Sequence, residues 1–149
     1  MYTCRKSYRD IPFAHRQHNH DGHCAFVHGH NWTFTFEFAA RTLDETGFVI
    51  DFGKLGFIRQ EIRSRFDHAY VYNRDDEDSL RLLKAEGALF KGLEVERCSC
   101  EGIAHYLMEL IQPLVRSATG GRVWIAAVEV DEDSKNSARY EIPPPSPAP

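Results

Sequence analysis

Strict alternation of apolar and polar residues marks the segment His30–Ala40 as the clearest strand in the chain. Trp32, Phe34, Phe36 and Phe38 are separated by threonine or glutamate, and such a period of two gives a strand with one aromatic face. The turn DETG and the apolar FVIDF after it predict a return strand and hence a hairpin. Further strands are predicted at Tyr2–Arg5, Leu93–Arg97 and Arg122–Val130.

Helical spacing replaces this alternation in three other segments. Between Lys54 and Phe66, apolar residues recur every three or four positions and charged residues lie between them. A shorter helix is predicted over Ser79–Glu86, with Ser79 as its N-cap and Gly87 ending it. A third helix starts near Ser99, carries its apolar stripe from Ile103 to Leu114, and should bend at Pro113.

The order of these elements predicts one α+β domain, residues 1–141, in which helices cover one face of an antiparallel sheet. A sheet of four strands would leave open edges, for which pairing with other subunits is a natural remedy. The proline-rich end, residues 142–149, can join neither sheet nor helix and is expected to be disordered.

Composition excludes several classes of partner. With 149 residues, a net charge of -4 and no basic patch, the chain is not expected to bind nucleic acid. No apolar run approaches the roughly 20 residues of a membrane span. The first residues, MYTCRKSYRD, lack the apolar core of a signal peptide, which predicts a cytoplasmic protein.

The segment HCAFVHGHNW holds the most unusual chemistry in the sequence. His28 and His30 lie two apart at the entry of a predicted strand, so both imidazoles face the same side and could share a zinc ion. Spacing leaves the third ligand open, and the candidates are His15, His18, His20 and His23, with His68 and His105 more distant.

Other interpretations of this segment remain open at this point. HGH could be a polar strand end without a metal. Cys24 could instead close a structural zinc site as a thiolate. The other close cysteine pair, Cys98 and Cys100, is favoured as a plain start to the third helix, because C-x-C alone is weak evidence for a metal.

Four motifs follow one another along the chain: FAH at Phe13–His15, C-x-x-x-H-G-H-N at Cys24–Asn31, GFVIDF at Gly47–Phe52 and FDH at Phe66–His68. This ordered set resembles the 6-pyruvoyl-tetrahydropterin synthase and 6-carboxy-tetrahydropterin synthase family. The resemblance extends from the first strand to about Tyr140. It implies a tunnelling fold (T-fold), in which four-stranded antiparallel sheets of several subunits join into a barrel, usually as a hexamer of two stacked trimers.

The resemblance also implies roles for particular residues. His15, His28 and His30 would hold Zn2+. Cys24 would be the catalytic cysteine, paired with an acid/base dyad, Asp67 and His68. For the pterin ring it implies two carboxylates, Glu132 after the last strand and Glu101 at the start of the last helix.

Around these carboxylates the chain departs from the pattern of the family. Ser99 and Cys100 replace residues that are usually Thr-Thr or Pro-Thr, Gly102 stands where asparagine is common, and Asp133 replaces a threonine. Interpretations without a catalytic role also exist. Asp67 and His68 could form a salt bridge at a helix end, and DED at Asp131–Asp133 could be a solvated strand end.

The activity implied is that of a zinc-dependent lyase acting on 7,8-dihydroneopterin triphosphate. A 6-carboxy-tetrahydropterin synthase releases acetaldehyde and triphosphate on the route to queuosine and other 7-deazaguanines, and the compact chain favours this type. The alternatives are a 6-pyruvoyl-tetrahydropterin synthase, which eliminates triphosphate only, and a non-catalytic zinc and pterin carrier. In either synthase, a cysteine that does not bind the metal could take up a substrate proton.

Overall fold

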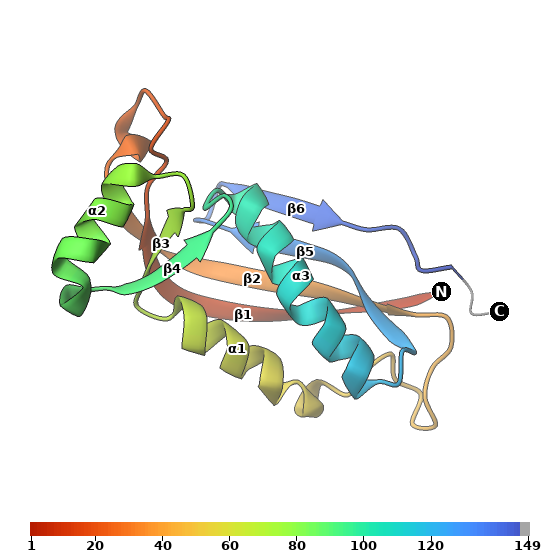
Figure 1. The fold of residues 1–149 in the computed structure, drawn as a ribbon. Helices are drawn as coiled ribbons and strands as arrows, with labels where there is room; N and C mark the ends of the chain where they lie inside the picture. The colour runs from red at the N-terminus through yellow and green to blue at the C-terminus, as the bar shows by residue number, and fades with distance from the viewer. Residues whose placement is uncertain (147–149) are drawn as a thin grey trace.

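The computed structural model describes residues 1–146 and folds into one curved six-stranded sheet (Figure 1). The strand order is β4-β3-β1-β2-β5-β6. The strands are β1 (Tyr2–His15), β2 (His28–Ala40), β3 (Ala69–Asn73), β4 (Lys91–Val95), β5 (Val123–Asp131) and β6 (Ser137–Glu141). The helices are α1 (Gly56–Phe66), α2 (Glu77–Glu86) and α3 (Cys100–Ala118).

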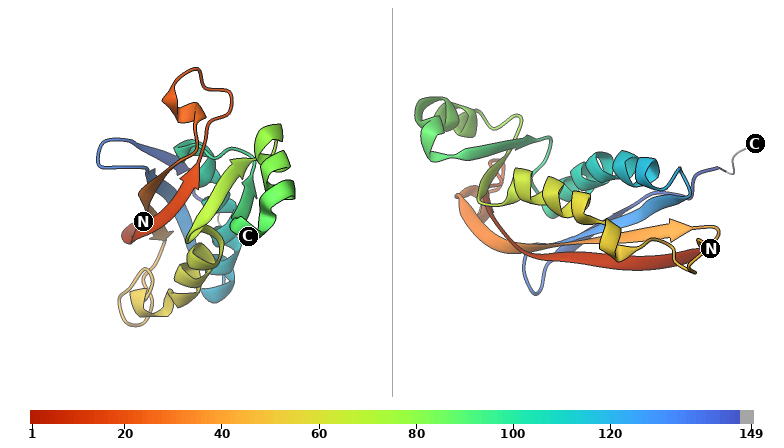
Figure 2. Two further views of the ribbon diagram at one scale, coloured as in Figure 1. Left: turned by 90° about the vertical axis from the view of Figure 1, so that its left-hand side faces the viewer. Right: turned by 90° about the horizontal axis from the view of Figure 1, so that it is seen from below.

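Two helices cover one face of the sheet, and the third lies at its end. α3 packs over β5 and β6, and α1 over β1 and β3. Figure 2 shows both helices on the same side of the curved sheet, with α2 displaced toward β3 and β4. The predicted α+β class with helices on one face is therefore confirmed.

The core forms where the aromatic stripe of β2 meets these helices. Trp32, Phe34, Phe36 and Phe38 are fully buried, as their alternation predicts. Opposite them are apolar residues of α1 and α3, among them Ile58, Ile62, Phe66, Ile103, Leu107 and Ile111. β1 adds Phe13, whose ring stacks on that of Trp32 at 4.5 Å between centroids.

The predicted hairpin between the β2 segment and FVIDF is wrong. β2 is flanked by β1 and β5 instead, and residues 48–51 form no strand. Asp44 holds the preceding turn by accepting bonds from the backbone N–H groups of Thr46 and Phe48. Val49 and Ile50 bury their side chains in the core from an irregular segment, which explains why their apolar run resembled a strand.

The sheet is also larger and less regular than predicted. β1 runs for 14 residues rather than ending at Arg5, and β3 and β6 were not predicted. β3 pairs in parallel with both β1 and β4, so the sheet is mixed rather than antiparallel. The chain reaches β3 through α1 and β4 through α2, and such helical crossovers permit parallel neighbours.

The helix positions agree with the sequence better than the helix caps do. α2 is capped by Asp76, whose carboxylate accepts from the Ser79 N–H, so the prediction of Ser79 as N-cap is wrong. Ser99 caps α3 by accepting from the Gly102 N–H, and Pro113 lies within that helix. Across residues 1–146, no helix has the length and apolar character needed to cross a membrane.

Part of the proline-rich end contacts the domain. The Ile142 N–H donates to the Ala126 carbonyl at 3.0 Å, and the Arg41 guanidinium donates to the Pro145 carbonyl at 2.9 Å. Residues 142–146 form no helix or strand. The remainder of the expected disordered tail, residues 147–149, lies outside the described residues.

Truncation of the aromatic stripe is expected to destabilise the fold. Phe36→Ala removes a fully buried ring, and the free energy of unfolding should fall by about 3–5 kcal/mol. Phe26→Ala is the matched control, because this ring is 73% exposed and its loss should change stability by less than about 0.5 kcal/mol. Urea unfolding of both variants checks this expectation, and equal losses would contradict the assigned core.

Candidate metal centre and active-site cleft

Three imidazoles meet where β1 ends and β2 begins. His15 lies directly opposite His28 in the strand pairing, and Phe13 lies opposite His30, so all three histidines project from the same face as the aromatic stripe. The ring centroid of His15 is 4.7 Å from that of His28 and 5.6 Å from that of His30. Among the candidates for a third ligand, His15 is the histidine that lies in one group with His28 and His30.

A carboxylate from the end of β5, the other neighbour of β2, joins these imidazoles. Glu132 follows β5 directly, and its Oε1 lies 3.0 Å from His15 Nε2 and 3.2 Å from His30 Nε2. One donor atom from each of the four residues lies within 4.8 Å of every other. The family resemblance implied a contact between Glu132 and the pterin ring. The proximity of Glu132 to the imidazoles could not be predicted from the sequence, because it depends on how β5 pairs with β2.

Hydrogen bonds to backbone carbonyls set the tautomers of two imidazoles. His15 Nδ1 donates to the Cys98 carbonyl at 2.8 Å, and His28 Nδ1 donates to the Phe26 carbonyl at 2.7 Å. A carbonyl oxygen only accepts, so each Nδ1 carries a proton, and in the neutral imidazole the lone pair is then on Nε2. Burial lowers the pKa of His15 below its ordinary value, and the neutral imidazole is the form that binds a metal.

Two other ring nitrogens of this cluster, one in His15 and one in His30, are buried without a hydrogen-bond partner among residues 1–146. Within residues 1–146, the buried Nε2 atoms of His15 and His30 form no well-directed hydrogen bond, although Glu132 Oε1 is close to both. Orphaned buried polar atoms are uncommon and call for an explanation. A cation among the three imidazoles and the carboxylate would satisfy them, and this donor set fits Zn2+.

A cleft of about 520 Å³ opens beside this cluster. Cys24 reaches it from the loop between β1 and β2, where its carbonyl accepts from the Gln17 N–H at 2.8 Å. Glu101 and Cys100 line the cleft from the first turn of α3, and Glu132 from the end of β5. Three further lining residues, not singled out from the sequence, belong to the β5–β6 turn and the start of β6: Lys135, Asn136 and Ser137.

The cysteines near the cluster differ in their surroundings. Burial raises the pKa of the Cys98 thiol to about 11. Burial, together with the charges of Glu132 and Glu101, raises the pKa of Cys100 to about 12. Both groups stay protonated at neutral pH and are poor proton acceptors, so Cys24 is the cleft thiol to which the proton-transfer hypothesis still applies.

Asp67 and His68 form a close pair outside this cleft. Asp67 Oδ1 lies 2.6 Å from His68 Nδ1, at the junction of α1 and β3. His68 has a φ of +58°, which is unfavourable for a residue with a side chain, and its imidazole is 82% exposed. Neither residue lines the cleft with Cys24, so a single chain does not bring the predicted dyad to the predicted cysteine.

The other histidines occupy distinct places. His18 Nδ1 contacts the amide of Asn73 at 2.9 Å, and His20 lines the cleft. His23 belongs to a short 3-10 helix, His23–Ala25, that also carries Cys24. His105 lies on α3, where its Nε2 is 3.7 Å from Glu109. None of these four belongs to the cluster of donor atoms.

The fold and the histidine centre together define a class of protein. The chain belongs to the 6-pyruvoyl tetrahydropterin synthase family, whose profile matches residues 4–143. Among curated relatives, the 6-carboxy-5,6,7,8-tetrahydropterin synthase of Rickettsia felis is 31% identical over 101 residues, or 66% of this chain and 64% of that protein. The Rickettsia typhi protein of the same name is 34% identical over 70 residues, or 46% of this chain and 51% of that protein. The chain therefore matches less than two thirds of the length of either relative.

Solved structures support the fold. An uncharacterized protein from Wolinella succinogenes superposes with a TM-score of 0.81 at 21% identity, covering 94% of this chain and 97% of that one. The 6-pyruvoyl tetrahydropterin synthase of Caenorhabditis elegans gives 0.65 at 19% identity, covering 95% and 96%. The expected tunnelling fold is thus confirmed, with six strands in place of four.

Removing an imidazole is expected to abolish metal binding. The unchanged protein is expected to hold stoichiometric zinc. His15→Ala and His28→Ala each leave too few nitrogen donors for a tight zinc site, so these purified variants should contain little or none. Elemental analysis after dialysis against a weak chelator measures this loss. His105→Ala is the control: His105 lies on α3, outside the cluster of donor atoms, so this variant should contain as much zinc as the unchanged protein.

Glu132→Gln tests the fourth donor in the same assay. Three imidazoles can hold zinc without a fourth protein ligand, so this variant should retain the ion. Full zinc content in both His→Ala variants would contradict the assigned centre.

Proposed function

We propose that this chain is a zinc-dependent lyase of the 6-carboxy-tetrahydropterin synthase type. Its substrate would be 7,8-dihydroneopterin triphosphate, with acetaldehyde and triphosphate released, on the route to 7-deazaguanine compounds. The observation that carries the proposal is the convergence of three imidazoles and a carboxylate beside a cleft that Cys24 also lines. The names of the Rickettsia relatives support the carboxy type.

His15, His28 and His30 would hold the zinc ion. When bound, zinc acts as a Lewis acid that polarises substrate oxygens and makes a neighbouring C–H more acidic. The chain prepares the ligands in advance, since the carbonyls of Cys98 and Phe26 already orient the imidazoles of His15 and His28. Such outer contacts fix the direction of the ligating nitrogen and raise its basicity.

Cys24 would accept the substrate proton at its Sγ. It shares the cleft with the histidine centre, which brings the thiol near the metal without making it part of the cluster of donor atoms. A cysteine outside the coordination sphere can move a proton, whereas a ligating thiolate is held by the ion. Cys98 and Cys100, whose raised pKa values keep them protonated, do not compete for this role.

Glu132 and Glu101 would bind the pterin ring. A pterin presents a 2-amino group beside a ring N–H, and one carboxylate can accept from both as a bidentate pair. Glu132 contacts the imidazoles of His15 and His30 and lines the cleft. Three imidazoles can hold zinc without a fourth protein ligand, so its carboxylate would be free to hold the ring next to the metal. Glu101 faces the same cleft from the first turn of α3 and would support the ring there.

The acid/base dyad would come from a second copy of the chain. Asp67 orients the imidazole of His68, which is exposed to solvent and does not line the cleft of its own chain. In the described part of the chain, the outer strands of the sheet, β4 and β6, each pair on one side only. Joining these edges between subunits, in a hexamer of two trimers, would extend the sheet into a barrel and could bring His68 to a neighbouring Cys24.

Product analysis is expected to distinguish the two synthase reactions. Incubation with 7,8-dihydroneopterin triphosphate should release acetaldehyde, measured by coupled reduction with alcohol dehydrogenase. A pyruvoyl product without acetaldehyde would favour the 6-pyruvoyl type instead.

Cys24→Ala should lower turnover by about 100-fold or more, the scale of a lost proton-transfer group. Cys4→Ala, at the far end of β1, should leave turnover unchanged.

Mixing two inactive variants tests the shared site. Cys24→Ala and His68→Ala should each be inactive alone. After co-refolding, some sites would combine an intact Cys24 with an intact His68 from another chain, so part of the activity should return. Mass spectrometry verifies that the chains have exchanged. If the mixed oligomers are still inactive, the shared site is wrong: Cys24 and His68 then act within one chain, or one of them has no catalytic role.

A further inference from the structure

Cys98 links the histidine centre to the rest of the fold. It lies in residues 96–99, the connection between β4 and α3, and its side chain is fully buried. Its carbonyl accepts from His15 Nδ1 at 2.8 Å, and its thiol donates to the Arg16 carbonyl at 3.1 Å. Cys98 thus contacts the last residue of β1 and the residue after it. Because it belongs to no strand or helix, other groups must fix its own position.

Asn73 holds Cys98 from one side. This residue ends β3 and is 3% exposed, and its Oδ1 accepts from the Cys98 N–H at 2.7 Å. The other end of the same amide contacts His18 Nδ1 at 2.9 Å. One buried side chain therefore connects to His15 through Cys98, and directly to the loop that carries Cys24.

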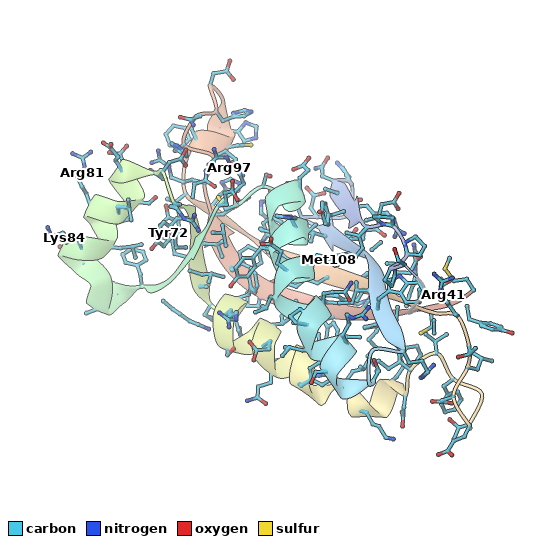
Figure 3. The ribbon with its side chains drawn as sticks, turned by 45° about the vertical axis from the view of Figure 1, so that its right-hand side comes forward. Arg41, Tyr72, Arg81, Lys84, Arg97 and Met108 are labelled. Carbon is cyan, nitrogen blue, oxygen red and sulfur yellow. The ribbon has the colours of Figure 1, made fainter. Side chains whose placement is uncertain are left out.

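Gly102 holds the same connection from the other side. A Cβ atom added at Gly102 would lie 2.2 Å from the Arg97 carbonyl oxygen, far inside contact distance. The backbone before Cys98 therefore packs directly on the first turn of α3, and Figure 3 shows Arg97 beside that turn. A side chain at position 102 would have to push residues 97 and 98 away from the helix.

We infer that Asn73 and Gly102 are positioning residues for the metal centre: together they fix Cys98, whose carbonyl orients the His15 imidazole. The inference rests on the proposed metal at His15, His28 and His30. It gives Gly102, a departure from the family pattern, a physical reason. It also gives the buried Cys98 a role as a link rather than as a metal ligand.

The test perturbs Cys98 in two independent ways and measures zinc affinity. Asn73→Ala removes the acceptor of the Cys98 N–H, and Gly102→Ala displaces the Arg97 backbone. Loss of an outer contact to a ligand weakens metal binding by about 10- to 100-fold, and that is the expected result for each variant. Chelator competition gives the dissociation constant, and the absorption of the Co2+-loaded protein reports changed ligand geometry.

Matched variants separate positioning from general loss of stability. Gln112→Ala removes another amide that bonds a backbone N–H and C=O, those of Ile125, at a distance from the histidines. Gly56→Ala adds a Cβ that, apart from its chain neighbours and the backbone of its own helix, meets no atom of residues 1–146 within 4 Å. Both should bind zinc like the unchanged protein. Asn73→Asp keeps an oxygen for the Cys98 N–H and should do the same, while thermal unfolding of the metal-free proteins compares their stabilities.

The outcomes distinguish this inference from the proposed function. If the unchanged protein binds no zinc, the metal centre is wrong and the inference falls with it. If it binds zinc and Asn73→Ala and Gly102→Ala bind equally well, only the inference is overturned. If one of these variants does not fold, the other still decides, and weak zinc binding by Asn73→Asp would count against the inference as well.

Discussion

The pairing register between β1 and β2 is the constraint on which both the core and the metal centre depend. It sets His15 opposite His28, Phe13 opposite His30 and Ile11 opposite Trp32, so one face carries apolar residues along its length and histidines at its end. A slip of one residue would turn these side chains to the other face of the sheet. The aromatic stripe buries four large rings, and this burial makes such a slip costly. The core thereby holds the histidine geometry in place.

The histidine centre in turn places a cost on the fold. The Nε2 atoms of His15 and His30 are buried without well-directed partners among residues 1–146, and each unsatisfied group costs about 1–3 kcal/mol. Hydrogen bonds from Nδ1 of His15 and His28 to backbone carbonyls hold these two rings with their Nε2 atoms toward the centre. Proposed metal binding would therefore stabilise the folded state as well as prepare the chemistry.

Local patterns in the sequence predicted those features that depend on one element at a time. Alternation identified β2 and its buried face, and helical spacing identified α1 and α3. The failures involve long-range pairing: FVIDF is apolar because Val49 and Ile50 enter the core, not because they join a strand. The short AYVYN of β3 and the half-exposed β6 carry too weak a pattern to predict, and parallel pairing depends on crossovers that periodicity does not show.

The residues of the candidate site likewise differ in whether local spacing or long-range strand pairing brings them together. A spacing of two placed His28 and His30 together, whereas His15 and Glu132 join them only through the neighbours of β2 on either side, β1 and β5. Family resemblance named both residues, but it could not show that Glu132 contacts the imidazoles. Asp67 and His68 do not line the cleft, and within residues 1–146 the strands at both edges of the sheet pair on one side only. The proposed barrel, in which each chain supplies the dyad of its neighbour, would both pair these edges and bring the dyad to the cleft.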